Sequence, residues 1–230
     1  MSRIKVMDEI LANKIAAGEV IEKIASVVKE LVENSIDAKS TNIKVNLINA
    51  GLDTIEVIDD GIGMDKVDAK NAFLRHATSK IYKEDDLYFI DTLGFRGEAL
   101  ASIASVSEVK LSTFDGKEST FVHIKGGLVL EESICPEKRG TTIEVTNIFY
   151  NTPARLKYLK SENTELGNCT SFIERLALSK CDIAFCLTNN DKVIVKTSGS
   201  GNLLKTIHEI FGMNISSNML EFKASNDDLL

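Results

Sequence analysis

Asp59 lies where the predicted strand TIEVID ends, directly before the glycines of GIG at residues 61–63. A carboxylate at this point can accept a hydrogen bond from an exocyclic amine, and Gly61 and Gly63 let a flat ring approach the backbone closely. Adenine carries such an amine, whereas guanine has a carbonyl oxygen at the equivalent position. Thr141, at the start of a later strand, could help hold the edge of a base. Ordinary turns are the alternative at both places, because Asp-Asp-Gly is a common turn sequence.

The stretch GFRGEAL (94–100) places two glycines before an apolar helical run. Free backbone N–H groups at a helix N-terminus, with the partial positive charge found there, form an anion site that suits phosphates. Gly94 and Gly97 would permit a close approach, and Arg96 would add charge. A glycine-punctuated helix start explains the pattern equally well. A Walker A loop is excluded because GxxxxGK[ST] does not occur in the sequence.

A polar segment between these two motifs could cover bound phosphates. Residues 77–93 show no regular pattern, and RHATSK (75–80) places Thr78, Ser79 and Lys80 at their start. A loop of this length without regular structure is more often functional than not, and a lid is one such function.

Glu30, Asn34 and Asp37 form a row on a predicted helix that includes KELVENSIDA (29–38). At about 100° per residue, the three fall within roughly 60° of one another, and apolar residues fill the opposite arc. The row therefore borders the buried face, whereas Lys29 and Glu33 point further round, towards solvent. An ordinary polar rim is the alternative, and this stretch alone favours it.

The elements that must position these residues are predicted from hydrophobic periodicity. Helices are expected over 21–37 and 66–76, after Gly97, from Pro153, and over 165–179 and 202–212. A hairpin-like pair of strands is expected over 42–48 and 54–59, an antiparallel meander over 108–114, 119–125, 128–134 and 141–147, and two strands over 182–188 and 192–197. Strands grouped together with helices beside them predict an α+β sandwich rather than a doubly wound parallel sheet.

Composition limits the class of protein. The 230 residues suit one large domain, or one domain and part of another, and 43% hydrophobic and 27% charged residues are ordinary for a globular chain. No apolar run approaches the roughly 18 residues that cross a membrane and no signal-peptide start is seen, so we expect a cytoplasmic protein. The four cysteines form no CxxC pair, which predicts reduced thiols. A net charge of −7 argues against a surface that binds nucleic acid throughout, but is compatible with one positive groove.

Taken together, four motifs resemble the signatures of the GHKL ATPase superfamily. In chain order they are ELVENSIDA (30–38), DDGIGM (59–64), GFRGEAL (94–100) and GTT (140–142). Four further stretches resemble the MutL family alone: NKIAAGEV (13–20), RHATSK (75–80), GFRGEALASI (94–103) and FYNTPAR (149–155). The resemblance extends from about Ile10 to at least Leu159.

The resemblance implies a fold and a chemistry. The fold is a Bergerat-type two-layer sandwich, in which helices cover one face of a mixed, mostly antiparallel sheet. The chemistry is that of a Mg²⁺-dependent ATPase that binds ATP and ADP. Glu30 matches the general base that polarises the attacking water, Asn34 matches the amide that ligates Mg²⁺, and Asp37 would orient this cluster. The other nucleotide contacts fall in the remaining motifs and the lid: Asp59, Gly63, Thr78, Ser79, Lys80, Gly94, Phe95, Arg96, Gly97 and Thr141.

The same resemblance implies a domain organisation and partners. Residues 1–20 would be an arm that contacts a dimer partner, 21–212 the GHKL ATPase domain, and 213–230 the beginning of a truncated second, transducer domain. A lysine of that second domain would reach the γ-phosphate, so we expect slow hydrolysis by this chain. Expected partners are a second copy after ATP binding, a mismatch-recognition protein, a downstream nuclease or helicase, and DNA held weakly and without sequence preference, but no membrane.

Some features leave alternatives open. A nucleotide-binding regulatory module of the same superfamily that never hydrolyses ATP is the second hypothesis, and the presence of Glu30 favours the enzyme. The family usually has Arg-Pro where this chain has Lys23 and Ile24. Arg155, Lys157 and Lys160 form a basic run on a predicted helix that could touch DNA, although such runs are usually solvated faces.

Overall fold

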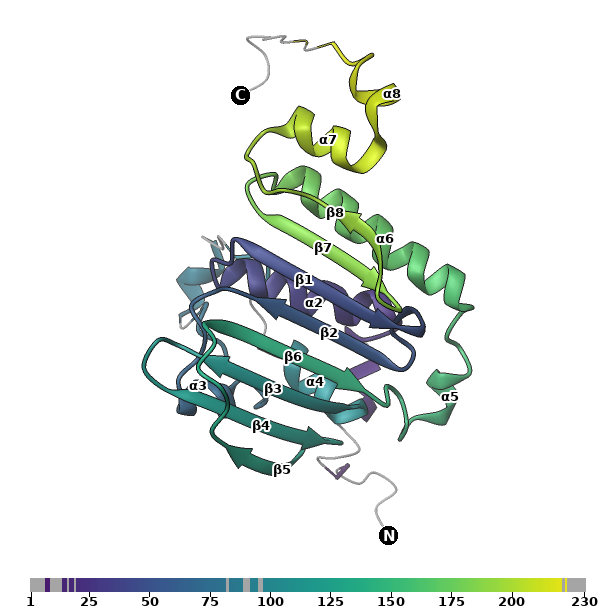
Figure 1. The fold of residues 1–230 in the computed structure, drawn as a ribbon. Helices are drawn as coiled ribbons and strands as arrows, with labels where there is room; N and C mark the ends of the chain where they lie inside the picture. Colours follow the sequence, from purple (N-terminus) through teal and green to yellow (C-terminus); the bar gives the residue numbers. More distant parts are fainter. Residues whose placement is uncertain are drawn as a thin grey trace.

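One mixed sheet forms the frame of the molecule (Figure 1). The computed structural model describes residues 7–8, 14–15, 17–18, 20–81, 83–88, 92–94, 97–220 and 222. The strands in this part of the chain are β1 (Asn42–Ile48), β2 (Thr54–Asp59), β3 (Glu108–Phe114), β4 (Ser119–Lys125), β5 (Leu128–Ser133), β6 (Gly140–Thr146), β7 (Ala184–Asn189) and β8 (Lys192–Lys196). Their order in the sheet is β5-β4-β3-β6-β2-β1-β7-β8. β1 and β7 are parallel and all other neighbours are antiparallel, which confirms the predicted mixed, mostly antiparallel sheet.

The predicted hairpin of β1 and β2 is confirmed, and its strand ends agree with the prediction. Ile48 pairs with Thr54 across the connecting residues, and Ile43 pairs with Asp59 at the other end. Apolar residues alternate with polar ones along both strands, as expected when one face of a sheet is buried. This register brings Asp59 to the end of β2, beside the start of β1.

The predicted meander of β3 to β6 was wrong in its last step. β6 does not pair with β5 but lies between β3 and β2. The six residues of β5 are all exposed, which suits an edge strand, whereas β6 buries Ile143 and Val145 in the middle of the sheet. Consecutive strands are neighbours only about two-thirds of the time, so chain order alone could not place β6.

The helices are α2 (Ile24–Asp37), α3 (Lys66–Asn71), α4 (Ala99–Val106), α5 (Pro153–Leu156), α6 (Glu162–Ser179), α7 (Leu203–Phe211) and α8 (Met213–Ser216), with 3₁₀ turns η1 (Asn49–Gly51) and η2 (Glu84–Tyr88). α2, α4 and α6 lie behind the sheet in Figure 1. The predicted helix over 66–76 is shorter than expected. His76, with φ of 60°, is outside the helical region. No helix among the described residues is long and apolar enough to cross a membrane.

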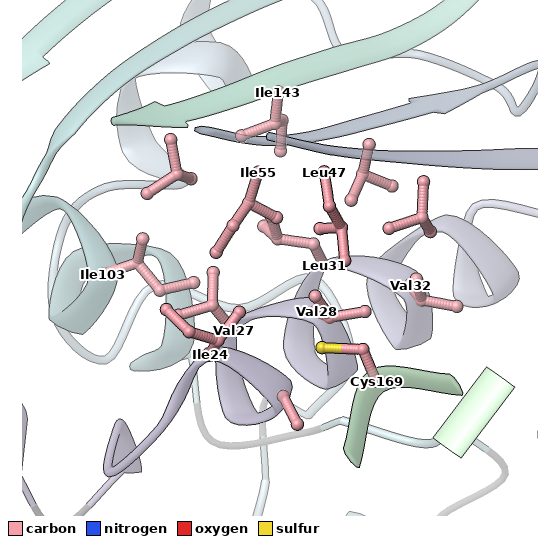
Figure 2. Packing of buried hydrophobic residues seen from close by; sticks show 14 of the residues in the cluster. Ile24, Val27, Val28, Leu31, Val32, Leu47, Ile55, Ile103, Ile143 and Cys169 are labelled. Atoms are coloured by element: carbon pink, nitrogen blue, oxygen red, sulfur yellow. The ribbon is translucent and has the colours of Figure 1, made fainter. Parts of the chain in front are cut away.

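The core lies between α2 and the inner face of the sheet. Figure 2 shows Val27 and Leu31 of α2 on the side of the helix that faces the sheet residues Ile55 and Leu47, while Val28 lies near Cys169 of α6, and all of these side chains are buried. Truncating a buried leucine to alanine costs about 2–5 kcal/mol, so this packing holds α2 firmly in place. The polar row on α2 is thereby fixed at the rim of the core.

Candidate functional site

The polar row on α2 lies beside the buried face, as predicted. The Glu30 side chain is 23% exposed and that of Asp37 is 9% exposed, while Leu31 and Ser35 next to them are buried. Lys29, at 50% side-chain exposure, points to solvent as expected and lies 3.7 Å from a Glu30 carboxylate oxygen. A carboxylate and an amide, Glu30 and Asn34, are therefore presented one turn apart on a rigid helix.

The expectation that Glu33 is solvated was wrong, because its side chain is only 13% exposed. Burial raises the pKa of Glu33, Lys29 lowers it and Glu30 raises it further. Its Oε2 lies 3.7 Å from Lys29 Nζ, one turn earlier on the same helix.

Lys80 joins two of the predicted motifs in space. Its Nζ lies 2.5 Å from Asp37 Oδ2 and 3.2 Å from Asn34 Oδ1. The same carboxylate accepts hydrogen bonds from Leu93 N at 3.1 Å and Gly94 N at 3.3 Å. Residues from ELVENSIDA, RHATSK and GFRGEAL therefore meet in one cluster, which sequence spacing alone does not predict.

Asp59 is 7% exposed and its two carboxylate oxygens are both used. Oδ1 accepts hydrogen bonds from Gly61 N at 2.9 Å and Thr141 N at 3.2 Å, and Oδ2 accepts one from Ser35 Oγ at 2.8 Å. Burial raises the pKa of Asp59, while these hydrogen bonds act to lower it. Oδ1 already accepts two hydrogen bonds, but Oδ2 accepts only one, so Asp59 can still accept a hydrogen bond from a bound amine at Oδ2.

Thr141 and Gly63 belong to the same corner of the molecule. Thr141 Oγ1 lies 3.1 Å from Thr113 Oγ1, which accepts a hydrogen bond from Met64 N at 2.9 Å. Gly63 has φ of +72°, and a Cβ there would lie 2.2 Å from the carbonyl oxygen of Phe114. DDGIGM is therefore packed against the end of β3, which pairs with β6, the strand that begins with GTT, and there is no room for a side chain at Gly63.

GFRGEAL has the features of an anion site, but part of it is outside the described residues. α4 begins at Ala99, and the side chain of its N-cap residue, Glu98, makes no capping hydrogen bond. A Cβ at Gly97 would lie 2.4 Å from the Ala77 carbonyl oxygen, so this loop packs directly on the RHATSK stretch. Phe95 and Arg96 are outside the described residues. Uncapped N–H groups at this helix start are suited to phosphate oxygens.

The remaining predicted lid residues differ in their surroundings. Thr78 is partly buried, and its hydroxyl accepts a hydrogen bond from Lys80 N at 3.2 Å, whereas Ser79 is exposed. The structure thus brings Asn34, Asp37, Lys80 and Gly94 together, and separately Asp59 and Thr141.

Two residues of the site were missed from the sequence. Ser35 links α2 to Asp59 by donating to Oδ2, and its hydroxyl oxygen also lies 3.1 Å from the Leu31 carbonyl oxygen, which is the alternative acceptor. Thr113 links Met64 to Thr141 and is 1% exposed. Each is a polar residue in a row of apolar ones. Ser35 lies on the buried side of α2, and Thr113 lies on the buried side of the strand EVKLSTF. A polar residue at a buried position needs a partner, which is the signal that could have found both.

The oxygens of Asn34 and Asp37 suit a divalent cation such as Mg²⁺, which prefers oxygen ligands. The Lys80 ammonium that contacts both oxygens shows that they face a cation. Among the described residues, no group of three or more His, Cys, Asp or Glu side chains could hold a metal ion. A cation here would therefore have few protein ligands, as is usual for Mg²⁺ bound together with substrate phosphates.

Comparison with known proteins points in the same direction. Residues 21–133 match a family described as histidine kinase-, DNA gyrase B- and HSP90-like ATPase. The chain is 53% identical to the DNA mismatch repair protein MutL of Ligilactobacillus salivarius and 51% identical to that of Lacticaseibacillus casei, in each case over 99% of this chain and 35% of the relative. The chain thus spans about a third of the length of these curated relatives.

Solved structures show the same fold. The Aquifex aeolicus MutL ATPase domain complexed with ADP superimposes with a TM-score of 0.69 and 32% sequence identity, covering 84% of this chain and 70% of that chain. The N-terminal domain of a DNA repair protein superimposes with a TM-score of 0.74 and 28% identity, covering 87% of this chain and 60% of the other.

Proposed function

The chain belongs to the MutL family of the GHKL ATPases, and from this premise we propose that it binds ATP with Mg²⁺ and hydrolyses it. One observation carries the proposal. Asn34, Asp37, Lys80 and the Gly94 amide converge at the rim of α2, where a charged phosphate chain and its cation would find complementary groups. The relative bound to ADP makes an adenine nucleotide the natural candidate ligand.

Each end of the nucleotide would contact a different part of the site. Asp59 would accept the hydrogen bond of the adenine amine, with Thr141 and the close backbone at Gly63 shaping the space around the ring. Lys80, with Thr78 and Ser79, and the backbone from Gly94 to Gly97, including Phe95 and Arg96, would hold the phosphates. The uncapped start of α4 adds N–H donors and a favourable dipole.

Hydrolysis would depend on the α2 row. Glu30 would accept a proton from the attacking water as general base, and Asp37 would orient the groups around it. Asn34 would hold Mg²⁺, which neutralises charge on the phosphates during phosphoryl transfer. A neutral amide oxygen at this position completes the coordination without cancelling the charge of the metal. The rest of the protein's contribution is positioning by a helix fixed in the core.

The test combines binding and turnover. ATP and GTP affinities are measured with and without Mg²⁺, and hydrolysis is measured for Glu30→Ala. The expected results are preference for ATP, and retained ATP binding with turnover lowered about 10²–10⁴-fold in the variant. Glu22→Ala, which removes an exposed carboxylate just before α2, is the matched control and should leave both properties unchanged. Equal affinities for ATP and GTP, or full turnover by Glu30→Ala, would contradict the proposal.

At the level of the whole protein, we propose that residues 21–212 are the ATPase domain of a mismatch repair factor that dimerises when ATP binds and couples a mismatch-recognition protein to a downstream nuclease or helicase. Residues 1–20 and 213–230 would contact the partner copy and begin the next domain; much of both lies outside the described residues. The Arg155 guanidinium contacts the N-terminal arm, because its Nη2 donates to the Ile15 carbonyl oxygen at 3.3 Å and lies against Gly18. α5 also ends at Leu156, so Lys157 and Lys160 are not on one helix with Arg155.

A further inference from the structure

Lys80 occupies the position that the proposed function assigns to a metal ion. Its Nζ lies 3.2 Å from the Asn34 amide oxygen and 2.5 Å from Asp37 Oδ2. The side chains of Lys80 and Asp37 are only 17% and 9% exposed, so this ion pair is shielded from water. An ion pair this sheltered is screened less than a surface pair and holds its partners more firmly.

We propose that Lys80 and a divalent cation compete for the oxygens of Asn34 and Asp37, so that Lys80 must leave before the cation binds. The inference rests on the proposed function, since it concerns the cation of that same site. Two positive groups cannot share the Asn34 oxygen without strong repulsion in a partly buried place. The lysine therefore opposes binding of the metal alone.

A bound nucleotide would give the displaced Lys80 ammonium a new anionic partner. A Cβ at Gly94 would lie 3.3 Å from Lys80 Nζ, so the ammonium already borders the loop proposed to hold phosphates. A phosphate bound there offers Lys80 a new anionic partner at the moment the cation takes its place on Asn34 and Asp37. Nucleotide and metal should therefore each raise the affinity for the other, with Lys80 as the group that links them.

Lys80 also ties the surrounding chain to α2. Asp37 accepts the Leu93 and Gly94 amides through the same carboxylate that holds Lys80. Exchange of lysine for metal changes the charge next to these two hydrogen bonds. The exchange thus reaches both flanks of the predicted lid, at residues 77–81 and 92–94, without requiring any movement of α2.

The experiment measures binding of Mn²⁺ alone to the chain, by titration followed by electron paramagnetic resonance. Lys80→Met should bind Mn²⁺ at least about tenfold more tightly than the wild type, because one nearby positive charge is removed. Lys80→Arg keeps the charge and should bind Mn²⁺ as weakly as the wild type. Lys83→Met is the matched control, because it removes a positive charge from an exposed position of the same segment. Its Mn²⁺ affinity should equal that of the wild type.

A second variant locates the ion. Adding Asn34→Ala to Lys80→Met should abolish the gain in Mn²⁺ affinity, and retention of the gain would overturn the proposal, as would equal Mn²⁺ affinities for the wild type and Lys80→Met. The wild type is also titrated with ATP in the presence of Mg²⁺. If the wild type binds ATP but Lys80→Met binds Mn²⁺ no more tightly than the wild type, the proposed competition between Lys80 and the cation is wrong and the proposed function stands. If ATP does not bind, the proposed function itself fails.

Discussion

Replacing Asp59 by asparagine should separate the proposed recognition of the base from folding. Oδ1 accepts from Gly61 N and Thr141 N, and an amide oxygen can accept both hydrogen bonds in the same place. At Oδ2 the new amide would present N–H groups. Ser35 can then donate to the Leu31 carbonyl oxygen, which it already contacts at 3.1 Å, and accept from the amide. Asp59→Asn should therefore fold.

The charge of Asp59 makes folding harder at neutral pH. Burial raises the pKa of this carboxyl, so the folded wild type loses stability as pH rises from the ordinary value of 3.8 through the raised one. Asp59→Asn lacks this loss, and its free energy of unfolding at neutral pH should be within about 1 kcal/mol of the wild type or higher. Binding should suffer much more. A charge-assisted hydrogen bond contributes about 1.5–3 kcal/mol, so ATP affinity should fall roughly 10- to 150-fold.

Asp60→Asn is the matched control. Asp60 Oδ1 accepts hydrogen bonds from the Thr41 and Asn42 amides at 2.7 and 2.9 Å, at the start of β1. Burial raises the pKa of Asp60, but the hydrogen bonds from these two residues outweigh it and leave the pKa below its usual value. This variant should lose stability and keep the preference for ATP over GTP. Nucleotide affinities are measured by isothermal titration calorimetry and stability by urea unfolding. A folded Asp59→Asn that binds ATP within about twofold of the wild type would refute the assignment.

Three further outcomes test the structure. Gly63→Ala should lower the free energy of unfolding by about 2 kcal/mol or more in urea, since its Cβ would lie 2.2 Å from the Phe114 carbonyl oxygen at φ of +72°; a change below about 0.5 kcal/mol would contradict this contact. Hydrogen bonds from Lys125 and His123 lower the pKa of Glu108 from 4.5 to about 2, so the free energy of unfolding of the wild type should fall as pH falls through this range. Glu108→Gln should lose less stability over the same range, and parallel curves of stability against pH would contradict the hydrogen bonds of Glu108 with Lys125 and His123. Burial raises the pKa of Cys169 to about 12, so iodoacetamide should label it slowly in the folded chain and fast in urea, and equal rates would show that the thiol is not packed in the core.

Local elements were predictable from the sequence because their signals are local. β1 and β2 have alternating apolar residues and a short connection between them, and both ends of each strand agree with the prediction. The polar row of α2 follows from helical periodicity, and its place at the core rim was predicted correctly. The order of β6 in the sheet depends on contacts between distant residues, and no local pattern contains that information.

The contacts of the site were harder to predict than its motifs. Lys80 could be assigned to a lid from RHATSK, but its contact with Asn34 and Asp37 depends on how an irregular segment crosses α2. Ser35 and Thr113 have polar side chains in apolar settings, and their partners became visible only once α2, β2 and β3 were packed together.

The link between Ser35 and Asp59 ties the two ends of the site into one mechanical unit. Asn34 and Ser35 are consecutive residues of α2, and one lies with the Lys80 cluster while the other hydrogen-bonds to Asp59. A sliding movement of this helix along the sheet would alter the spacing at both places at once. A natural substitution that loosens the packing of α2, for example at Leu31, should thus weaken the proposed contacts with the base and with the phosphates together. Selection would then act on the two sets of contacts as a single trait.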